Sequence, residues 1–357
     1  MPQPVRWATK YLRILKKVFK KKDKYKIAIV GATGIVGESL LDILHSRNFP
    51  SSEIDVVASS RSVDTKVKYG DQLLSIVAID SYDFSDVDIA FFSAGSEVSK
   101  KYVPEATKSG TIVIDNTSEF RYVDNIPLII PEVNPEHIKD YKDTNIISNP
   151  NCSTIQMLVA LKPVHDRFHI EEINVSTYQA VSGSGKKGMN ELIEQSHAYF
   201  DQKKINSSVY PKQIAFNVLP FVDSFCENHY TKEEMKMVWE TQKILDKSIK
   251  VNATAVRVPV LVGHSESITI RTKTAIDIDK ILEDYKSNDS IEVIDNPMTN
   301  EYPTAFFNGH GTDKVYIGRI RKGLDSDNIL NIWVVADNVR KGAALNSIQI
   351  AENLIKE

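Results

Sequence analysis

The first half of the chain alternates short apolar runs with segments of helical spacing. Apolar runs that suit buried strands lie at 26–30, 54–59, 87–93 and 110–116, and helical spacing occurs at 38–46 and 102–110. Strands that alternate with helices are typical of a parallel sheet with crossover connections. We therefore predict a Rossmann-like parallel-sheet domain over residues 25–151.

The pattern changes after Cys152. Helices are predicted at 153–168, with a kink or an end near Pro163, at 186–200 and at 231–246, where Thr231 and Glu234 form a capping-box pattern. Alternating strands are predicted at 172–181, 254–262, 266–276, 314–320 and 328–337, several of them joined by short links. We predict an α+β domain with a mainly antiparallel sheet over 152–335, followed by a closing helix within 336–357.

Composition limits the function classes. A chain of 357 residues suits two domains, and 42% hydrophobic with 25% charged residues is typical of a soluble globular protein. Its net charge of −3 gives no reason to expect nucleic-acid binding, and no apolar run is long enough to span a bilayer. Two cysteines are too few for a disulfide framework, so we expect a reducing, cytoplasmic compartment.

The charge is concentrated at the N-terminus. Met1–Lys24 holds nine Lys or Arg and one acid, so it carries +8 and leaves −11 for the remaining residues. Its apolar residues recur at helical spacing: Trp7, Tyr11, Ile14, Leu15 and Val18. Three interpretations stay open, which are a solvated extension, a membrane-surface helix and an organelle-targeting segment.

The sequence GATGIVG, from Gly31 to Gly37, follows a predicted strand and precedes a predicted helix. Gly31 permits a tight turn, Gly34 lets the backbone approach a pyrophosphate, and Gly37 allows close packing. At the end of the second strand, where NAD enzymes place an acid, Arg61 stands between serines. Arginine can pair with a 2′-phosphate, which favours NADP over NAD.

Cys152 lies in the polar sequence SNPNCSTIQM, at the start of a predicted helix. A helix N-terminus lowers the pKa of a thiol, so Cys152 is either a nucleophile or a small filler residue. A thiolate that adds to a carbonyl allows hydride transfer between aldehyde and thioester, and a base must move one proton. His264, which follows Gly263 after an apolar strand, is the candidate base, although it could be structural.

Several motifs together resemble the bacterial type of aspartate-semialdehyde dehydrogenase. These motifs, in chain order from about Lys26 to the C-terminus, are GATGIVG, ASSRS, NTSEFR, PEVN, SNPNCSTIQM, TYQAVSGSG, YTKEEMKM, RVPVLVGHSESI and WVVADNVRKGAALNSIQIAE. The sequence SGSGKKG departs from the family at Ser184, where a small apolar residue is common.

The resemblance implies a role for each matching residue. Cys152 would be the nucleophile, His264 the general acid/base and Gln179 a group that positions the thioacyl intermediate. The substrate-binding residues would be Arg257 for the carboxylate, Glu233 (or its neighbour Glu234) for the amino group, and Arg121, Lys236 and Asn151 for phosphate. The cofactor-binding residues would be Gly31, Thr33, Gly34, Ile35, Val36, Gly37, Arg61, Ser62, Ser182, Gly183 and Asn338.

The implied activity is NADPH-dependent reductive dephosphorylation of L-aspartyl 4-phosphate to L-aspartate 4-semialdehyde, in lysine, threonine, methionine and diaminopimelate biosynthesis. The resemblance also implies a homodimer or homotetramer and no metal. Three alternatives remain at this stage. One is an N-acetyl-γ-glutamyl-phosphate reductase-like enzyme, another is a short-chain dehydrogenase using the Tyr-x-x-x-Lys match at Tyr199–Lys203, and the third is a non-catalytic nucleotide-binding paralogue.

Overall fold

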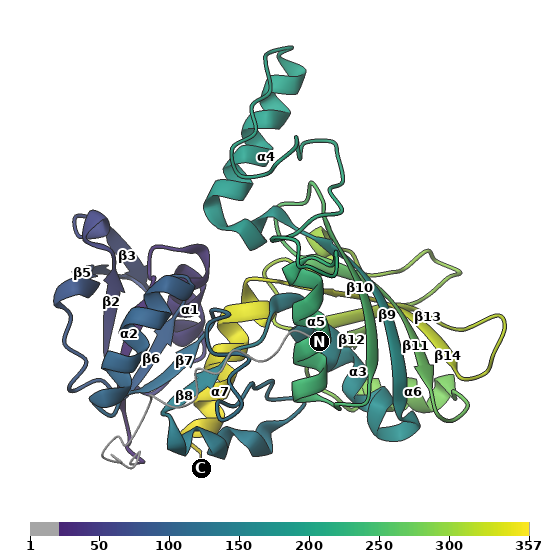
Figure 1. Ribbon diagram of the computed structural model, residues 1–357, viewed down its shortest axis with the longest axis horizontal. Coiled ribbons are helices and arrows are strands. Elements are labelled where there is room, and N and C mark those ends of the chain that lie inside the picture. Colours follow the sequence, from purple (N-terminus) through teal and green to yellow (C-terminus); the bar gives the residue numbers. More distant parts are fainter. Residues whose placement is uncertain (1–20, 357) are drawn as a thin grey trace.

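The computed structural model describes residues 21–356, which form two lobes and a projecting arm (Figure 1). Each lobe is built on its own six-stranded sheet. The predicted basic amphipathic segment lies, except for its last four residues, outside the described part of the chain. Among the helices of residues 21–356, none has the length and apolar character needed to cross a membrane.

The first sheet is entirely parallel and has the strand order β5-β2-β1-β6-β7-β8. Its strands are β1 (Tyr25–Val30), β2 (Ser51–Ala58), β5 (Val77–Ala78), β6 (Ile89–Phe92), β7 (Ile112–Asp115) and β8 (Ile146–Ser148). The chain runs from β1 to β2 on one side and then crosses to β6 on the other. This reversal creates the crevice at the carboxyl ends of the strands where open parallel sheets bind ligands.

Helices cover both faces of the first sheet. Ile27 and Ile29 of β1 pack with α1 (Ile35–Ser46) and with α7 (Leu345–Leu354), at the far end of the chain. Ala28 and Val30, the alternate residues of β1, pack instead with α2 (Ser96–Lys108). Because the side chains from Ile27 to Val30 are covered on one face or the other, this part of β1 is continuously apolar rather than alternating.

The second sheet is mixed, with the order β10-β9-β11-β14-β13-β12. Its strands are β9 (Ile170–Gln179), β10 (Lys250–Arg257), β11 (His264–Thr272), β12 (Ile291–Val293), β13 (Val315–Lys322) and β14 (Ile329–Ala336). Two pairs, β10–β9 and β12–β13, are parallel and the other three are antiparallel. The predicted fold class, a Rossmann-like lobe joined to an α+β lobe, is confirmed; the exact domain boundaries stay a prediction.

One face of the second sheet packs against α3 (Cys152–Phe168), α5 (Lys232–Ile244) and α6 (Ile278–Lys286) around a large apolar core. The helix α4 (Gly185–Phe200) leaves this lobe and forms the projecting arm with the loop that follows it (Figure 1). The 3₁₀ helices are η1 (Ser60–Ser62), η2 (Ile79–Ser81), η3 (Pro135–Asp143) and η4 (Val181–Ser184), and the short π-helices are η5 (Ala305–Gly309) and η6 (Arg340–Ala344).

The structure differs from the sequence pattern in several elements. The hairpin of β3 (Lys66–Tyr69) and β4 (Gln72–Ser75), and the short elements β8, β12 and α6, were not predicted. The helix α3 continues past Pro163 to Phe168. The strand predicted at 254–262 ends at Arg257, since Pro259 has no N–H to donate to a sheet ladder.

Candidate active site

Cys152 is the first residue of α3, and the residue before it caps the helix. The side chain of Asn151 accepts hydrogen bonds from the backbone N–H groups of Ser153 and Thr154. A β-carbon placed on Gly342 would lie 2.7 Å from that of Cys152, so only glycine allows this segment to approach so closely. Cys152 is therefore half-buried and fixed at the junction of both lobes.

The expectation that the helix start lowers the thiol pKa is wrong for this pocket. Burial raises the pKa of Cys152 to about 12, and the carboxylate of Glu233 raises it further. Arg257, Arg121 and Lys236 act in the opposite direction but do not outweigh burial. The cost of removing the thiol from water therefore exceeds the stabilisation of the thiolate by these three cations. The thiol is accordingly protonated at neutral pH.

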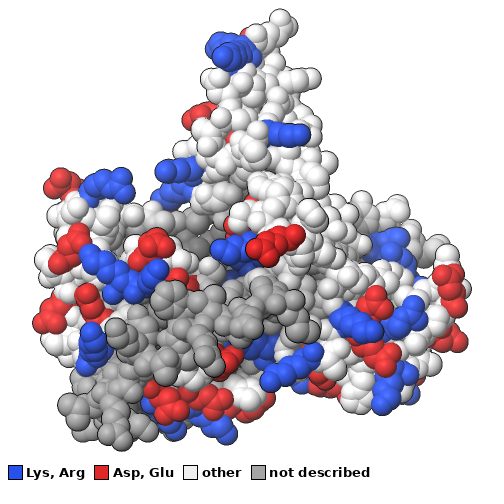
Figure 2. Space-filling model, in the orientation of Figure 1, with Lys and Arg blue, Asp and Glu red and all other residues white. Residues whose placement is uncertain are grey.

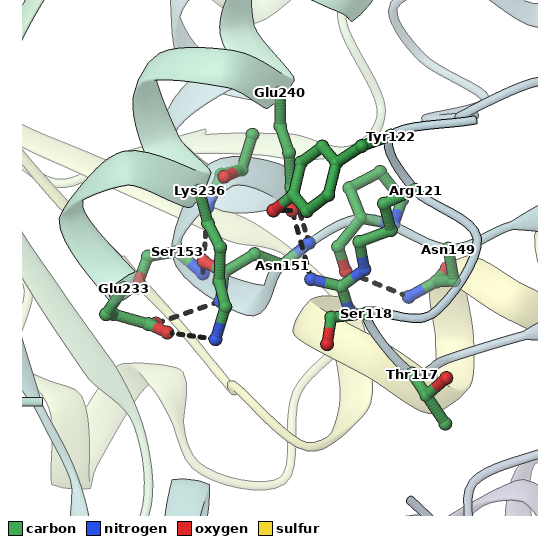
Figure 3. Close-up of polar contacts among 12 residues, drawn as sticks. Thr117, Ser118, Arg121, Tyr122, Asn149, Asn151, Ser153, Glu233, Lys236 and Glu240 are labelled. Atoms are coloured by element: carbon green, nitrogen blue, oxygen red, sulfur yellow. Dashed lines mark hydrogen bonds and ion pairs between the residues drawn. The ribbon is translucent and has the colours of Figure 1, made fainter. Parts of the chain in front are cut away.

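Glu233 is the central acceptor of the site. Its Oε1 accepts a hydrogen bond from Asn151 Nδ2 at 2.8 Å, and its Oε2 pairs with Lys236 Nζ at 3.0 Å (Figure 3). Oε1 also accepts a hydrogen bond from Gln179 Nε2 at 3.1 Å. Burial alone would raise the pKa of Glu233, but Lys236, Asn151 and Arg257 together hold it at about 2. Glu233 is thus a buried carboxylate that stays ionised at neutral pH.

The neighbouring acid, Glu234, has a different role. It completes the predicted capping box, because it exchanges hydrogen bonds with Thr231 at the start of α5. Its other carboxylate oxygen accepts the N–H of Ala255. One oxygen of Glu234 thus caps α5 and the other holds α5 against β10, so Glu233 is the member of the pair that faces the site.

Three predicted residues from different segments meet at one end of β9. Arg257, the last residue of β10, lies opposite Gln179 in the sheet register. β11 begins at His264 on the other side of β9, where Ser265 lies opposite Tyr178. Gly263 makes the reversal possible with a φ of +90°. The chain therefore turns back between Arg257 and His264, which brings both residues to the same end of β9.

The ring of His264 is buried and has one fixed hydrogen bond. The backbone N–H of Ala180 donates to Nδ1 at 3.0 Å, so the neutral ring carries its proton on Nε2. Burial and the nearby charge of Arg257 lower the pKa of His264 to about 3. Nε2 is buried and has no partner among residues 21–356, which makes it a free donor inside the pocket.

Arg121 is held at the site by a residue that sequence reasoning missed. Its Nη1 donates to Glu240 at 3.0 Å and its Nη2 donates to the carbonyl of Asn116 at 2.8 Å. Burial opposes the charge of Arg121, but the charge of Glu240 outweighs that effect and raises the pKa of the guanidinium. Glu240 lies seven residues after Glu233 on α5, and this helical spacing was the available signal.

The glycine loop has the geometry that its sequence predicts. Gly31 has a φ of +95°, and a β-carbon there would lie 2.9 Å from backbone atoms of Ser93 and Ala94. A β-carbon on Gly37 would lie 2.3 Å from the carbonyl oxygen of Gly31. The helix α1 starts after the exposed Gly34 without a side-chain cap, so its first N–H groups are free to donate hydrogen bonds to an anion.

The other predicted cofactor residues lie around this loop. Thr33, Ile35 and Val36 belong to the loop and to the first turn of α1, and Arg61 and Ser62 form η1 directly after β2. In the second lobe, Asn338 Oδ1 accepts from Ser182 Oγ and from the N–H of Gly263. Gly183 lies between Arg257 and His264, since a β-carbon there would be 2.8 Å and 3.6 Å from them.

Lys186 connects the predicted cofactor residues of the second lobe to those of the glycine loop. Its Nζ donates to the carbonyl of Thr33 at 3.2 Å and pairs with Glu38 of α1. The loop that departs from the family pattern at Ser184 therefore lies beside the glycine loop. By contrast, Tyr199 lies at the end of α4 in the projecting arm, where its ring packs on Phe216. The Tyr-x-x-x-Lys match at Tyr199–Lys203 therefore lies in the projecting arm and not beside the glycine loop.

Comparison with known proteins decides the family. The family models described as "Semialdehyde dehydrogenase, NAD binding domain" and "Semialdehyde dehydrogenase, dimerisation domain" match residues 26–141 and 161–341. An aspartate-semialdehyde dehydrogenase from Shewanella violacea is 52% identical over 94% of this chain and 99% of its own length. The chain belongs to the aspartate-semialdehyde dehydrogenase family.

Solved structures of aspartate-semialdehyde dehydrogenases have the same architecture. The Vibrio cholerae enzyme II complexed with ASA superposes with a TM-score of 0.92 at 47% identity, covering 94% of this chain and 99% of that one. The Candida albicans enzyme with NADP has a TM-score of 0.71 at 25% identity, covering 93% and 98%. The predicted family and its oxidoreductase class are thus confirmed.

Arg61 can be tested as the residue of this chain that selects the cofactor. Arg61→Asp should shift preference from NADP toward NAD, because an acid repels the 2′-phosphate and can accept a ribose hydroxyl. Loss of a charge-assisted contact predicts a change of roughly 10- to 100-fold in the ratio of the two kcat/KM values. An unchanged ratio would show that Arg61 does not contact the 2′-phosphate.

A second prediction concerns Glu266, which is fully buried on β11 two residues after His264. Burial raises its pKa well above the ordinary range, and only Gln156 opposes this. The folded enzyme therefore keeps Glu266 protonated while the unfolded chain ionises it above about pH 4.3. The contribution of this proton to the free energy of unfolding is fully present below that pH. It decreases by about 1.4 kcal/mol for each pH unit as the pH rises above it.

Glu266→Gln should remove this pH dependence, since an amide stays neutral. We expect the variant and the wild type to have similar thermal midpoints at pH 5. At pH 8 the variant should unfold at the higher temperature. A constant difference between the two proteins across this range would mean that Glu266 is ionised in the folded state.

Proposed function

We propose that this chain catalyses the NADPH-dependent reductive dephosphorylation of L-aspartyl 4-phosphate to L-aspartate 4-semialdehyde. The observation that carries the proposal is the grouping of Cys152, His264 and Gln179 with the charged side chains of Arg257, Glu233, Lys236 and Arg121. Gln179 donates to Glu233 and to Ser153, the residue after Cys152, and a β-carbon on Gly183 would approach both Arg257 and His264. Named relatives with this activity are about half identical over nearly the whole chain.

The charges of the pocket suit the two ends of such a substrate. Arg257 is buried, and its Nε has no partner among the described residues, so it can bind the α-carboxylate. Glu233 is ionised and can pair with the amino group. Arg121 and Lys236 supply the positive charge that a phosphate dianion needs, and Asn151 lies between them and Cys152.

In the first step, the Cys152 sulfur bonds to the acyl carbon and the bond from that carbon to the phosphate oxygen breaks. The thiol proton is transferred to the leaving phosphate, which departs as HPO₄²⁻. No free thiolate is needed, although the pKa of the Cys152 thiol is high. Gln179, held by Ser153 and Glu233, keeps the cysteine-bound acyl group oriented. His264 Nε2 donates a hydrogen bond to the acyl oxygen as charge develops there.

The cofactor site fits a dinucleotide. The close contacts at Gly31 and Gly37 and the uncapped start of α1 form a cradle for a pyrophosphate, and Arg61 stands where a 2′-phosphate would lie. When bound, the nicotinamide supplies the hydride that reduces the thioacyl group to the aldehyde. NADP is also the ligand of the Candida albicans relative.

Three alternatives are less favoured. An N-acetylated substrate carries no ammonium group, so an ionised and buried Glu233 would have no positive partner on it. A non-catalytic paralogue would have no need for Cys152 and His264 in one pocket. The short-chain dehydrogenase alternative is less favoured because Tyr199 lies at the end of α4, in the projecting arm.

The decisive experiment is an omission assay in the reverse direction. Aspartate semialdehyde, NADP and inorganic phosphate are mixed with the protein, and each is left out in turn while NADPH absorbance is followed. Formation of NADPH should require all three. NADPH formation without phosphate would reject an acyl-phosphate product and leave a plain aldehyde dehydrogenase.

The oligomeric state belongs to the same proposal. The family model of the second lobe is a dimerisation domain. Large apolar side chains are exposed on the arm and on the uncovered face of the second sheet, among them Phe200, Phe216 and Tyr178. Much of the arm surface seen in Figure 2 is uncharged. We propose a homodimer through these surfaces, and light scattering should give twice the chain mass, whereas four times that mass would indicate a tetramer.

A further inference from the structure

Glu240 is a buried acid with a contact to each of two functional segments. It lies on α5, its side chain is fully buried, and both of its oxygens accept hydrogen bonds. Oε1 accepts from Arg121 Nη1 at 3.0 Å and from Tyr122 OH at 3.3 Å, and Oε2 accepts from the backbone N–H of Asn151 at 2.7 Å (Figure 3). These segments lie 89 and 119 residues away in the chain.

The contact with Asn151 replaces part of a capping box. In a capping box, an acid three residues into the helix accepts the N–H of the N-cap residue. The helix α3 has Thr154 at that position, so it cannot provide such an acid. Glu240 provides the carboxylate from another helix and thereby fixes the residue that directly precedes Cys152.

The contact with Arg121 fixes the direction of the guanidinium. Glu240 and the carbonyl of Asn116 hold Nη1 and Nη2, and the buried Nε has no partner among residues 21–356. A planar guanidinium held at two nitrogens cannot rotate, so its remaining donors point in one direction. One carboxylate therefore controls both the cation and the start of the nucleophile helix.

We propose that Glu240 is a positioning residue that sets the Arg121 guanidinium relative to Cys152, and so determines how well the site binds phosphate. The inference rests on the proposed function, because it takes Arg121 as a phosphate-binding cation. Glu240 does not itself contact the substrate in this arrangement, since its oxygens are engaged by Arg121, Tyr122 and Asn151.

A purely structural role predicts a different pattern. If Glu240 only stabilises the fold, its loss lowers the thermal midpoint and changes the kinetic constants for all three reactants to a similar extent. If it positions Arg121, the effect is concentrated in the KM for inorganic phosphate and depends on Arg121 being present. These two patterns can be separated by a double-mutant cycle.

Glu240→Gln keeps the side-chain volume but leaves only one acceptor oxygen. If that oxygen accepts from Asn151, the amide NH₂ faces the Arg121 guanidinium; if it accepts from Arg121, the bond to Asn151 is lost. In the reverse assay we expect the KM for inorganic phosphate to rise about tenfold or more, the range for a lost charged hydrogen bond. The KM values for NADP and aspartate semialdehyde should change less than about threefold. In the Arg121→Leu background, Glu240→Gln should raise the phosphate KM by less than about twofold further.

Glu191→Gln is the matched control. Glu191 is also a buried carboxylate with several hydrogen bonds, but its partners are in the arm, at Ser208, Val209 and Tyr210. This variant should lose stability and keep the wild-type phosphate KM. If Glu240→Gln does not fold, Glu240→Asp replaces it, since the shorter carboxylate cannot reach both partners, and the same phosphate-specific rise is expected.

Two results would overturn the inference while the wild type still requires phosphate. One is an equal rise in the KM of all three reactants, and the other is a full additional effect of Glu240→Gln when Arg121 is already leucine. A wild type that forms NADPH without phosphate is a separate result, which rejects the proposed function itself.

Discussion

Cys152→Ser should abolish turnover while NADPH binding persists. Serine keeps the side-chain size, but its hydroxyl is a far weaker nucleophile than sulfur, and the burial that raises the pKa of the thiol also disfavours an alkoxide. We expect the rate to fall by at least about 10³-fold, the scale on which covalent catalysis depends on its nucleophile. The glycine loop lies in the other lobe, so the dissociation constant for NADPH, measured by fluorescence, should stay within about twofold.

The pKa of about 12 adds a second readout to this experiment. Alkylation of wild-type Cys152 by iodoacetamide should accelerate steadily between pH 7 and pH 10, without the plateau of a low-pKa thiol. Cys226, the other free cysteine, remains in the serine variant and serves as the internal control for labelling. Substantial turnover by Cys152→Ser would contradict the nucleophile assignment.

His264→Ala should lower the rate by about 10²- to 10⁴-fold, the usual contribution of a positioned proton donor. The variant loses the Nε2–H donor, and the N–H of Ala180 loses its acceptor. Binding of NADPH should again change little. A loss of tenfold or less would mean that His264 is a structural histidine of the β11 start.

The pH profile gives an independent check on His264. Because its pKa is about 3, the ring is neutral throughout the working range, and kcat/KM reports the free enzyme. Its profile should therefore show no limb near pH 6.5, the ordinary histidine value. A limb at that pH that disappears in His264→Ala would show that the ring titrates as an exposed imidazole does.

The local features of this protein were predictable because they depend on neighbours in the chain. The strand, turn and helix around Gly31 and Gly37 follow from glycine conformation and apolar spacing within a few residues. The capping box of Thr231 and Glu234 and the position of Cys152 at a helix start are local in the same sense. The resemblance to a known family then supplied the roles that no local rule could assign.

Other features depend on contacts between segments that are far apart in the sequence, so they could be established only from the tertiary structure. Arg257 and His264 meet Gln179 because β10 and β11 flank β9, a pairing that strand patterns do not specify. The choice of Glu233 over Glu234 follows from which acid the capping box uses.

The electrostatics of the site show the same division. The local sequence is enough to predict that the Cys152 thiol lies at a helix start, and a low thiol pKa is the expectation that follows from this position. The structure reversed it, because desolvation and Glu233 act on Cys152 only once α5 is packed beside α3. Glu240 was missed for the same reason, since a charged residue on a helix is normally solvated and only the packed structure buries it against Arg121 and Asn151.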